Sequence, residues 1–253
     1  MKDFRVIFIG TGGLDSVPKP NCNCRLCQVA RKGGKDDRIQ MGTLFNNVLI
    51  DCGIGVLQHL KAWRLEKEVE AVIISHPHKD HSFGLLDFSL KVPVFVERSA
   101  YSIMRKLFPR LDLRVYWPNK EFSIAGEKCL AKTIYHSVTQ FNHILKFGNQ
   151  LAYSVDIGKI TPDIVTFVNN VKLFIGDGFS VYKDFEIQNL KIHLSMINQL
   201  KELKKCKFDL FIFTGFGHHT KIPHEDLELL ISRWAGERNF KYQIELAFDG
   251  LAI

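Results

Sequence analysis

The sequence lacks the features that mark several large classes of protein. No apolar run among its 253 residues reaches the length of a membrane span, and residues 1–6 lead into a strand pattern without the hydrophobic stretch of a secretion signal. Apolar residues make up 46% and charged residues 24% of the chain, which is typical of soluble globular proteins. We therefore exclude a disordered, collagen-like or membrane-embedded chain, and we expect a cytoplasmic protein without a membrane partner.

An excess of acidic charge is also absent. The 34 Lys and Arg residues outnumber the 27 Asp and Glu residues, which gives a formal net charge of +7. A basic protein attracts anions, but net charge bears on association and not on fold. Nucleic acid is thus an open partner that we do not favour on charge alone. The sequence leaves the oligomeric state open, a homodimer included.

Cysteines are too few for a disulfide scaffold, because there are only six in the chain. Three of them lie close together, at Cys22, Cys24 and Cys27, and in a reducing compartment such a cluster usually binds a metal ion. The other three are isolated in apolar segments and are predicted to be small core residues: Cys52, Cys129 and Cys206.

Short apolar runs of strand length alternate with segments of helical periodicity along the chain. No low-complexity linker or charge block divides them, so we predict one domain, residues 1–253. The glycine-rich residues 10–13 are predicted to form a tight turn. The chain is rich in strands at first and then alternates strand and helix, which favours two facing sheets with helices outside. Functional residues are expected where strands end in polar loops.

The predicted elements are as follows. Strands are expected over residues 4–9, 38–45, 48–51, 70–75, 92–96, 114–117, 122–124, 129–135, 144–147, 151–155, 171–175, 208–213 and 242–248. Helices are expected over residues 54–63, 100–108, 161–169, 195–204 and 224–238.

The most specific local signal lies at the end of the predicted strand 70–75. Residues 75–81 read Ser-His-Pro-His-Lys-Asp-His, which supplies three imidazoles and one carboxylate: His76, His78, Asp80 and His81. Zinc takes neutral imidazole nitrogens and carboxylate oxygens as ligands, and a catalytic site leaves one position for water. The loop therefore predicts a metal centre whose ligands can surround two cations.

The His-X-His-X-Asp-His pattern resembles the signature of the metallo-β-lactamase superfamily, and the resemblance extends along the whole chain. It implies an α/β fold, a four-layer αββα sandwich of two facing mixed β-sheets with helices outside, and a dinuclear metal site at the sheet edges. It also implies ligands after later strands. His136 matches the third His of the first metal site, Asp156 the carboxylate that bridges both metals, and Asp51 a carboxylate that orients a ligand His.

Within that superfamily the chain is similar to the PhnP-type cyclic phosphodiesterases. The glycines of residues 10–13, the Cys-X-Cys-X-X-Cys cluster and the closing Phe-Asp-Gly-Leu-Ala-Ile carry this resemblance. It implies a structural zinc outside the active site, held by the three clustered cysteines and His218, whose role is to fix the surrounding loop. It also implies that His193 lies near the substrate phosphate. His193 could instead cap the following helix or lie on the surface, and Ser195 is an alternative cap for that helix.

One position departs from the PhnP-type pattern. That group carries Thr-His-X-Ser-His after the penultimate core strand, and its first His completes the second metal site, whereas residues 214–219 here read Thr-Gly-Phe-Gly-His-His. Gly215 thus stands where a ligand is expected. Three outcomes are open: weaker binding of the second metal, a reshaped loop that brings His219 or His218 inward, or a single-metal site with impaired catalysis. We favour weaker binding, because the bridging carboxylate remains.

These features lead us to expect a metal-dependent hydrolase that cleaves a phosphodiester, a small cyclic or nucleotide-like one, by a metal-activated hydroxide. One or two zinc or manganese ions are expected in the active site and one zinc ion at the Cys₃His site. Asp80 is expected to hold a metal and orient the nucleophile, and His193 to protonate the departing alkoxide. The alternatives are hydrolysis of another ester, lactone or thioester, cleavage at RNA 3′ ends, and a catalytically silent metal-binding protein.

Overall fold

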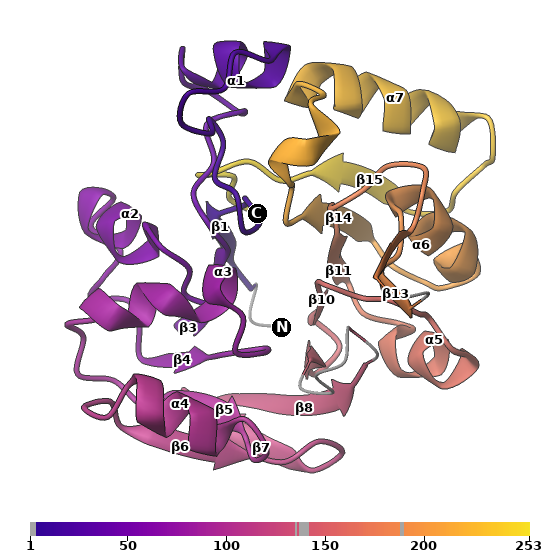
Figure 1. Cartoon of the computed structure of the whole chain (residues 1–253). Coiled ribbons are helices and arrows are strands. Elements are labelled where there is room, and N and C mark those ends of the chain that lie inside the picture. Colours follow the sequence, from indigo (N-terminus) through magenta and orange to yellow (C-terminus); the bar gives the residue numbers. More distant parts are fainter. Residues whose placement is uncertain (1–3, 135, 137–141, 188–189) are drawn as a thin grey trace.

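Two β-sheets face each other in this chain, and helices cover the outer side of each sheet (Figure 1). The computed structural model describes residues 4–134, 136, 142–187 and 190–253. The six-stranded sheet has the order β1-β2-β3-β4-β5-β6, and the seven-stranded sheet has the order β15-β14-β11-β10-β9-β8-β7. Both sheets contain parallel and antiparallel pairs. The prediction of a four-layer αββα sandwich with two mixed sheets is confirmed.

The elements have the following bounds. The six-stranded sheet consists of β1 (Val6–Gly10), β2 (Gly42–Phe45), β3 (Val48–Ile50), β4 (Ala71–Ile73), β5 (Val94–Glu97) and β6 (Leu113–Tyr116). The seven-stranded sheet consists of β7 (Glu121–Ile124), β8 (Glu127–Thr133), β9 (His143–Phe147), β10 (Leu151–Ser154), β11 (Leu173–Asp177), β14 (Leu210–Thr214) and β15 (Gln243–Leu246). β12 (Phe185–Ile187) and β13 (Leu190–His193) pair separately. The helices are α1 (Arg25–Ala30), α2 (Val56–Ala62), α3 (Lys79–Ser82), α4 (Tyr101–Leu107), α5 (Pro162–Val168), α6 (Met196–Leu203) and α7 (His224–Gly236), with 3₁₀ turns η1 (Phe83–Asp87) and η2 (His218–Thr220).

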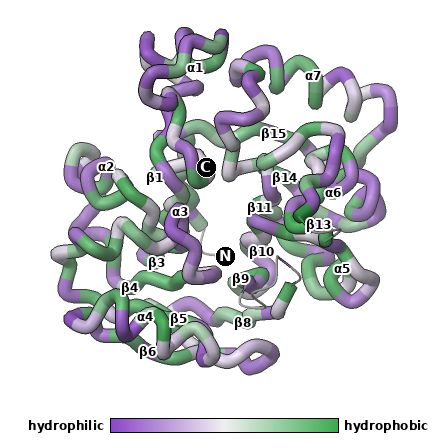
Figure 2. The backbone as a smooth tube through the Cα atoms, in the orientation of Figure 1, coloured by the Kyte–Doolittle hydropathy of each residue, from purple (hydrophilic) through white to green (hydrophobic). Residues whose placement is uncertain are grey.

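Alternate residues of the six-stranded sheet serve two different cores. Val6 and Phe8 of β1 belong to the core between the sheets, whereas Ile7 and Ile9 belong to the core under α2 and α4. Successive side chains of a strand point to opposite faces, so a strand covered on both sides must be apolar throughout. This is why residues 71–74 form an unbroken apolar run, and why the tube in Figure 2 is largely hydrophobic along the central strands.

The parallel pairs determine where polar side chains gather. β3 and β4 run parallel in one sheet, and β10, β11 and β14 run parallel in the other. Parallel strands bring their carboxyl ends to one edge of a sheet. The residues that directly follow these ends, or close the strand in the case of Asp177, therefore lie along two facing edges: Asp51, the loop from His76 to His81, Asp156, Asp177 and Gly215.

The predicted strands and helices all correspond to elements of the structure, with differences at their ends. The predicted strand 38–45 contracts to β2, and the predicted strand 129–135 corresponds to β8, with Tyr135 outside the described residues. The sequence reading missed α1, α3 and the β12–β13 hairpin, because helices of six and four residues and a short hairpin carry too few residues for a periodic signal. The three isolated cysteines are buried, as predicted.

The prediction of a tight turn at residues 10–13 is wrong. The segment is instead extended and lies against two other backbone segments. The Gly12 N–H donates to the Ile39 carbonyl at 2.7 Å, and the Gly13 N–H donates to the Phe216 carbonyl at 3.1 Å. A Cβ on Gly10 would lie only 1.9 Å from the Gln40 carbonyl oxygen. Gly10 and Gly12 are needed because two backbones approach closely, and not because the chain reverses.

Asp249 connects the C-terminal segment to residues 11 and 39 by hydrogen bonds. Its Oδ1 accepts hydrogen bonds from the Thr11 N–H at 2.9 Å and from the Thr11 hydroxyl at 2.6 Å, and its Oδ2 accepts one from the Ile39 N–H at 2.8 Å. The Arg38 guanidinium lies fully buried beside it and donates to the Thr11 hydroxyl at 2.7 Å. The closing Asp-Gly motif thus holds in place the segment that begins at Thr11 and leads toward Asp80.

Within the described residues, no helix has the length and apolarity to cross a membrane.

We expect Asp249→Ala to lower the free energy of unfolding by about 3 kcal/mol, because three donors lose their carboxylate acceptor in a nearly buried position. Urea denaturation measures this value. Asp112→Ala is the matched control, since the exposed Asp112 side chain pairs with Arg114 at the surface and should contribute less than about 0.5 kcal/mol. Equal effects of the two substitutions would contradict the assigned role of Asp249.

Candidate metal centre

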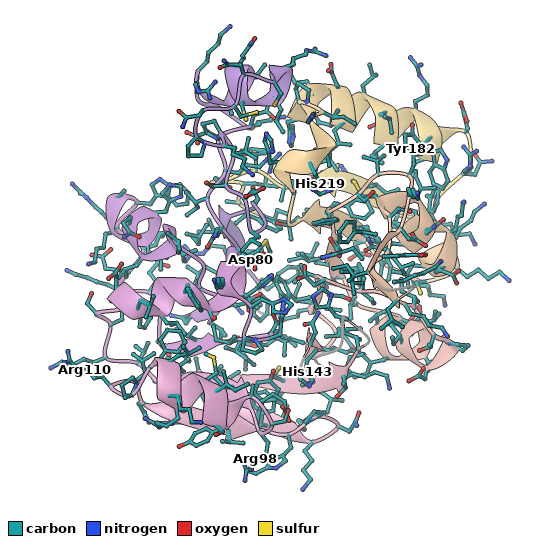
Figure 3. All side chains as sticks on the ribbon, viewed as in Figure 1. Asp80, Arg98, Arg110, His143, Tyr182 and His219 are labelled. Atoms are coloured by element: carbon teal, nitrogen blue, oxygen red, sulfur yellow. The ribbon has the colours of Figure 1, made fainter. Side chains whose placement is uncertain are left out.

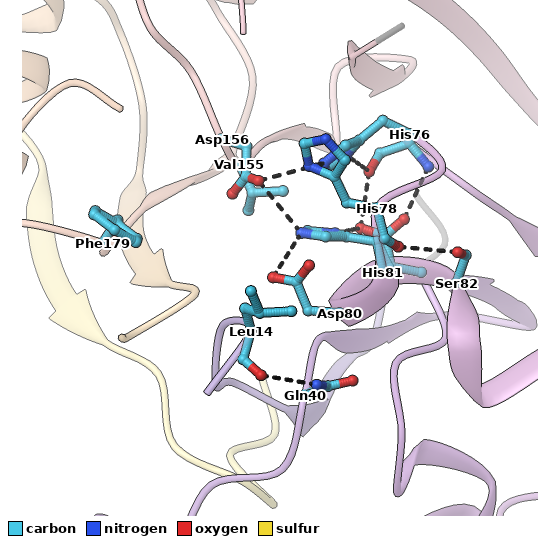
Figure 4. A network of polar contacts seen from close by, with 12 residues as sticks. Leu14, Gln40, His76, His78, Asp80, His81, Ser82, Val155, Asp156 and Phe179 are labelled. Atoms are coloured by element: carbon cyan, nitrogen blue, oxygen red, sulfur yellow. Dashed lines mark hydrogen bonds and ion pairs between the residues drawn. The ribbon is translucent and has the colours of Figure 1, made fainter. Parts of the chain in front are cut away.

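Four donor atoms from three separate segments converge between the sheets. They are His76 Nε2, His78 Nδ1, His136 Nε2 and a carboxylate oxygen of Asp156, and they all lie within 4.8 Å of one another. Figure 4 shows three of these residues, His76, His78 and Asp156. His76 and His78 follow β4, His136 follows β8, and Asp156 follows β10. The structure thus brings together the four residues that the resemblance assigned to the first metal site.

The spacing of these atoms fits a metal ion. Ligands at 2.0–2.1 Å from a tetrahedral zinc ion stand about 3.3 Å apart. Asp156 Oδ2 lies 3.3 Å from His76 Nε2 and 3.4 Å from His136 Nε2, and His136 Nε2 lies 3.4 Å from His78 Nδ1. The His76 Nε2 to His78 Nδ1 distance, 2.9 Å, is slightly shorter. The donor set and its dimensions therefore suit zinc or a similar divalent cation.

The opposite ring nitrogens of His76 and His136 are already engaged, so that these two imidazoles are oriented. His76 Nδ1 lies 3.1 Å from the Ser75 hydroxyl, and His136 Nδ1 donates to the Ile192 carbonyl at 2.8 Å. A hydrogen bond at one ring nitrogen sets the tautomer and turns the other nitrogen toward the centre. Burial lowers the pKa of His76 well below its usual value and that of His78 to about 4, so both rings are neutral at pH 7, which is the form that binds a cation.

A second position adjoins the first through the same carboxylate. His81 Nε2 lies 3.5 Å from Asp156 Oδ2 and 3.6 Å from Asp80 Oδ2. His81 Nε2 is buried and lacks a hydrogen-bond partner among the described residues. An orphaned buried nitrogen beside two carboxylates is costly unless a ligand pairs with it. Asp80, His81 and Asp156 therefore also fit a cation, as the resemblance implied.

Asp51 supports this second position by holding the His81 ring through a hydrogen bond. It is fully buried and accepts four hydrogen bonds, from the Ser75 N–H and hydroxyl, from His81 Nδ1 at 2.7 Å and from the Tyr153 hydroxyl at 2.9 Å. Its backbone φ of 60° lies in the left-handed region, which Asp tolerates better than most residues. The expectation that Asp51 orients a ligand His agrees with this geometry.

Gly215 leaves one side of the second position without a donor. A Cβ there would meet only Met41 Sδ, at 3.7 Å, so space for a side chain exists, although the φ of 80° favours glycine. His218 points instead toward the clustered cysteines, and the His219 ring lies against Phe179 with ring centroids 4.0 Å apart. In this structure neither imidazole supplies a donor to the second position, and the alternative in which a reshaped loop brings His219 or His218 inward stays a prediction.

Asp177 is a residue of the site that the sequence reading missed. Its Oδ2 accepts a hydrogen bond from His193 Nδ1 at 2.7 Å, and its Oδ1 accepts one from the Phe179 N–H at 2.8 Å. His193 Nδ1 also lies 3.8 Å from Asp156 Oδ1. Asp177 is the last residue of the apolar strand β11, in the sequence Gly-Asp-Gly. An aspartate at the end of an apolar strand is the same sequence signal that Asp156 offers, so the sequence could have indicated Asp177 as well.

His193 lies beside the centre and does not cap the next helix. Burial lowers its pKa, but Asp177 and Asp156 outweigh that effect and raise the pKa to about 9. The Phe179 ring stacks on the imidazole, with centroids 3.9 Å apart and planes at 10°. The cap of α6 is Ser195, whose hydroxyl accepts a hydrogen bond from the Asn198 N–H. The structure thus separates the two roles that the sequence left open.

The cysteine cluster forms a separate group near the surface. Cys22, Cys24, Cys27 and His218 place their ligand atoms within 4.8 Å of one another, with His218 Nε2 3.2 Å from Cys22 Sγ and 3.6 Å from Cys24 Sγ. A tetrahedral Cys₃His zinc site has these donors and comparable spacings. Because His218 lies in η2, three residues after Gly215, a metal here would fix the loop that borders the second position.

A family model and a curated protein both match part of this chain. Residues 46–216 match the model of the beta-lactamase superfamily domain. A ribonuclease Z of Picrophilus torridus is 37% identical over 83 residues, which is 32% of this chain and 22% of that protein. The chain therefore aligns with only about a fifth of the length of that relative.

Two solved structures share the fold over nearly their whole length. A diphosphatase of the PhnP family superposes with a TM-score of 0.80 at 20% identity, over 99% of this chain and 96% of that one. Zinc-bound PqqB from Methylobacterium extorquens superposes with a TM-score of 0.79 at 16% identity, over 98% and 99%. At these identities the likeness concerns the fold, in agreement with the predicted sandwich.

We expect Asp51→Asn to lower the free energy of unfolding of the metal-free protein by about 2–3 kcal/mol, because an amide nitrogen would face donors that now share a carboxylate. Asn keeps the size and tolerates the left-handed backbone, so the substitution isolates the hydrogen bonding. Asp15→Asn is the control, at an exposed position whose carboxylate pairs with Lys19. Urea unfolding that gave the same midpoint for both variants would rule out this role.

Proposed function

The chain belongs to the metallo-β-lactamase superfamily of hydrolases, and from that premise we propose that it is a metal-dependent phosphodiesterase acting on a small cyclic or nucleotide-like phosphodiester. The observation that carries this proposal is the position of the His193–Asp177 pair beside Asp156, at the edge of a donor set fit for two cations. Such a site combines positions for phosphate oxygens with a group that can protonate a leaving alkoxide.

The first cation position consists of His76, His78, His136 and Asp156, and the second of Asp80, His81 and Asp156. Zinc or manganese ions bound there would supply Lewis-acid stabilisation of the phosphate and a water of lowered pKa. Asp80 and Asp156 both border the second position beside His81 Nε2, so their oxygens can orient a nucleophile there. Asp51 holds the His81 ring, so that its Nε2 stays directed toward the shared carboxylate.

His193 is proposed as the proton donor. Its Nδ1–H is held by Asp177, and its ring is fixed against Phe179, so Nε2 is the nitrogen left to pass a proton. An alkoxide is a poor leaving group, and its departure from phosphorus is assisted by protonation in the transition state. Asp177 is a positioning residue, because it acts through the His193 ring and favours its protonated form.

The relatives support phosphorus chemistry over lactam or thioester hydrolysis. One is named a ribonuclease and another a diphosphatase, and both names denote cleavage of a bond at phosphorus. The match to ribonuclease Z keeps cleavage of RNA as the second candidate, although it covers only 83 residues. A small substrate remains our proposal, on the resemblance to PhnP-type enzymes that the cysteine cluster and the closing Asp-Gly motif carry.

We further propose that the second cation binds weakly. Asp80, His81 and Asp156 remain as its ligands, and position 215 itself offers no side-chain donor because it is a glycine. The loss of one neutral nitrogen ligand lowers affinity without removing the site, since the shared carboxylate stays in place. A catalytically silent protein would be expected only if the second cation position stayed empty at the metal concentrations in the cell.

The activity is tested with bis-p-nitrophenyl phosphate and 2′,3′-cyclic nucleotides in the presence of zinc or manganese. We expect turnover of both, and a loss in His193→Ala of about 10²–10⁴-fold for the cyclic nucleotide. The loss should be much smaller for bis-p-nitrophenyl phosphate, because p-nitrophenolate leaves without a proton. Asp177→Asn should follow the same pattern with a smaller effect.

An equal loss of activity on both substrates in His193→Ala would show that His193 does not act as the proton donor. Absence of turnover with every phosphodiester, in protein whose first cation position is filled, would refute the proposed function itself. Asp15→Asn serves as the control for handling and loading, because its side chain lies at the surface.

Weak binding of the second cation is tested by metal analysis after mild chelation. We expect the wild-type protein to retain about two zinc ions per chain. Gly215→His should retain about three, provided circular dichroism shows that it folds at the strained φ of 80°, since the added imidazole supplies the missing donor and its Cβ would meet only Met41 Sδ among the described residues. Cys22→Ser should retain about one fewer than the wild type. Retention of three zinc ions by the wild type would contradict the proposal.

A further inference from the structure

A groove lined by aromatic rings adjoins the candidate metal centre and plays no part in holding cations. Its volume is about 670 Å³, and the rings that line it are Phe179, Tyr182, Phe185 and His219. In Figure 3, Tyr182 and His219 lie on the side of α6 and α7, across the molecule's midline from Arg110, with Asp80 between. The groove therefore belongs to the half of the molecule that carries His193.

Three of the four rings, those of Phe179, Phe185 and His219, form a continuous series that starts at His193. The Phe179 ring stacks on His193 at 3.9 Å, and the same ring contacts His219 at 4.0 Å and Phe185 at 5.0 Å between centroids. The groove thus begins one ring away from the imidazole that we propose as the proton donor. A ligand with its phosphate at the metal centre would extend its next group into the groove.

Folding does not account for these rings. Tyr182 is 61% exposed and Phe185 is 40% exposed, so neither gains much from burial in this chain. The loop that carries them is nevertheless anchored to the start of α6: the Met196 N–H donates to the Ser180 carbonyl at 2.7 Å, and Asp184 accepts from the Ser195 N–H at 2.8 Å. Exposed rings on an anchored loop are pre-organised for a ligand.

We propose that this groove binds the aromatic base of a nucleotide whose phosphate lies at the metal centre. The inference rests on the proposed function. Flat rings offer faces on which a heteroaromatic base stacks. The groove is also lined by Ser180, Lys183 and Glu186 and by the Asn198–Asp184 pair. This polar lining suits the donors and acceptors at the edge of a base and does not suit a lipid chain.

The test compares two substrates that share a five-membered cyclic phosphate, 2′,3′-cyclic AMP and glycerol 1,2-cyclic phosphate, of which only the first carries a base. We expect Tyr182→Ala and Phe185→Ala each to raise KM for cyclic AMP about tenfold and to leave the kinetics of the glycerol ester unchanged. Tyr182→Phe keeps the ring and should keep the wild-type KM. Trp117→Ala removes a ring of similar exposure on β6's side of the molecule and should change neither substrate.

Unchanged KM values in both alanine variants, or equal losses on both substrates, would overturn the proposal. Calorimetric titration of AMP and ribose 5-phosphate into the zinc-loaded protein separates this inference from the proposed function. If neither cyclic ester is hydrolysed, the proposed function fails, while tighter binding of AMP that Tyr182→Ala abolishes would still support the base site. Equal affinity for AMP and ribose 5-phosphate would refute it.

Discussion

The carboxylate of Asp156 is the group on which the rest of the site depends. Its Oδ2 lies within 3.5 Å of His76, His81 and His136, and its Oδ1 faces His193. Burial alone would raise the pKa of this carboxyl, yet the surrounding imidazoles, His193 and His81 foremost, hold it well below its usual range. One buried negative charge thus joins both cation positions and the proposed proton donor.

The backbone places this carboxylate at some cost. Asp156 has a φ of 53°, in the left-handed region, directly after β10. The Asn142 side chain donates to the Asp156 carbonyl at 2.8 Å and to the Val155 carbonyl at 2.9 Å, which fixes the turn. Unusual backbone conformations persist where the surrounding structure over-determines them, and they concentrate at functional sites. This support comes from the residue that precedes β9, the strand that pairs antiparallel with β10 in the same sheet.

Much of this could be predicted from the sequence, and the failures have physical causes. The apolar runs predicted the central strands, and the His-X-His-X-Asp-His loop predicted the donors, because each signal lies within a few consecutive residues. Asp177 and the aromatic groove were missed because their meaning depends on contacts between distant segments, such as Asp177 with His193. The glycines at 10–13 were misread as a turn, since only the packed structure shows the Gln40 backbone that approaches them. The roles of His218 and His219 were separable only once their directions were known.

The central claim is that one shared carboxylate, Asp156, enables hydrolysis of a phosphodiester, and it is tested most directly by product analysis in ¹⁸O-labelled water. Zinc-loaded wild-type protein should convert 2′,3′-cyclic AMP into a single adenosine monophosphate isomer that carries one ¹⁸O atom on phosphorus. Asp156→Asn, which keeps the shape and the backbone conformation, should form no such product above background. Product formation by Asp156→Asn at the wild-type rate would contradict the account, as would a wild-type product without the label.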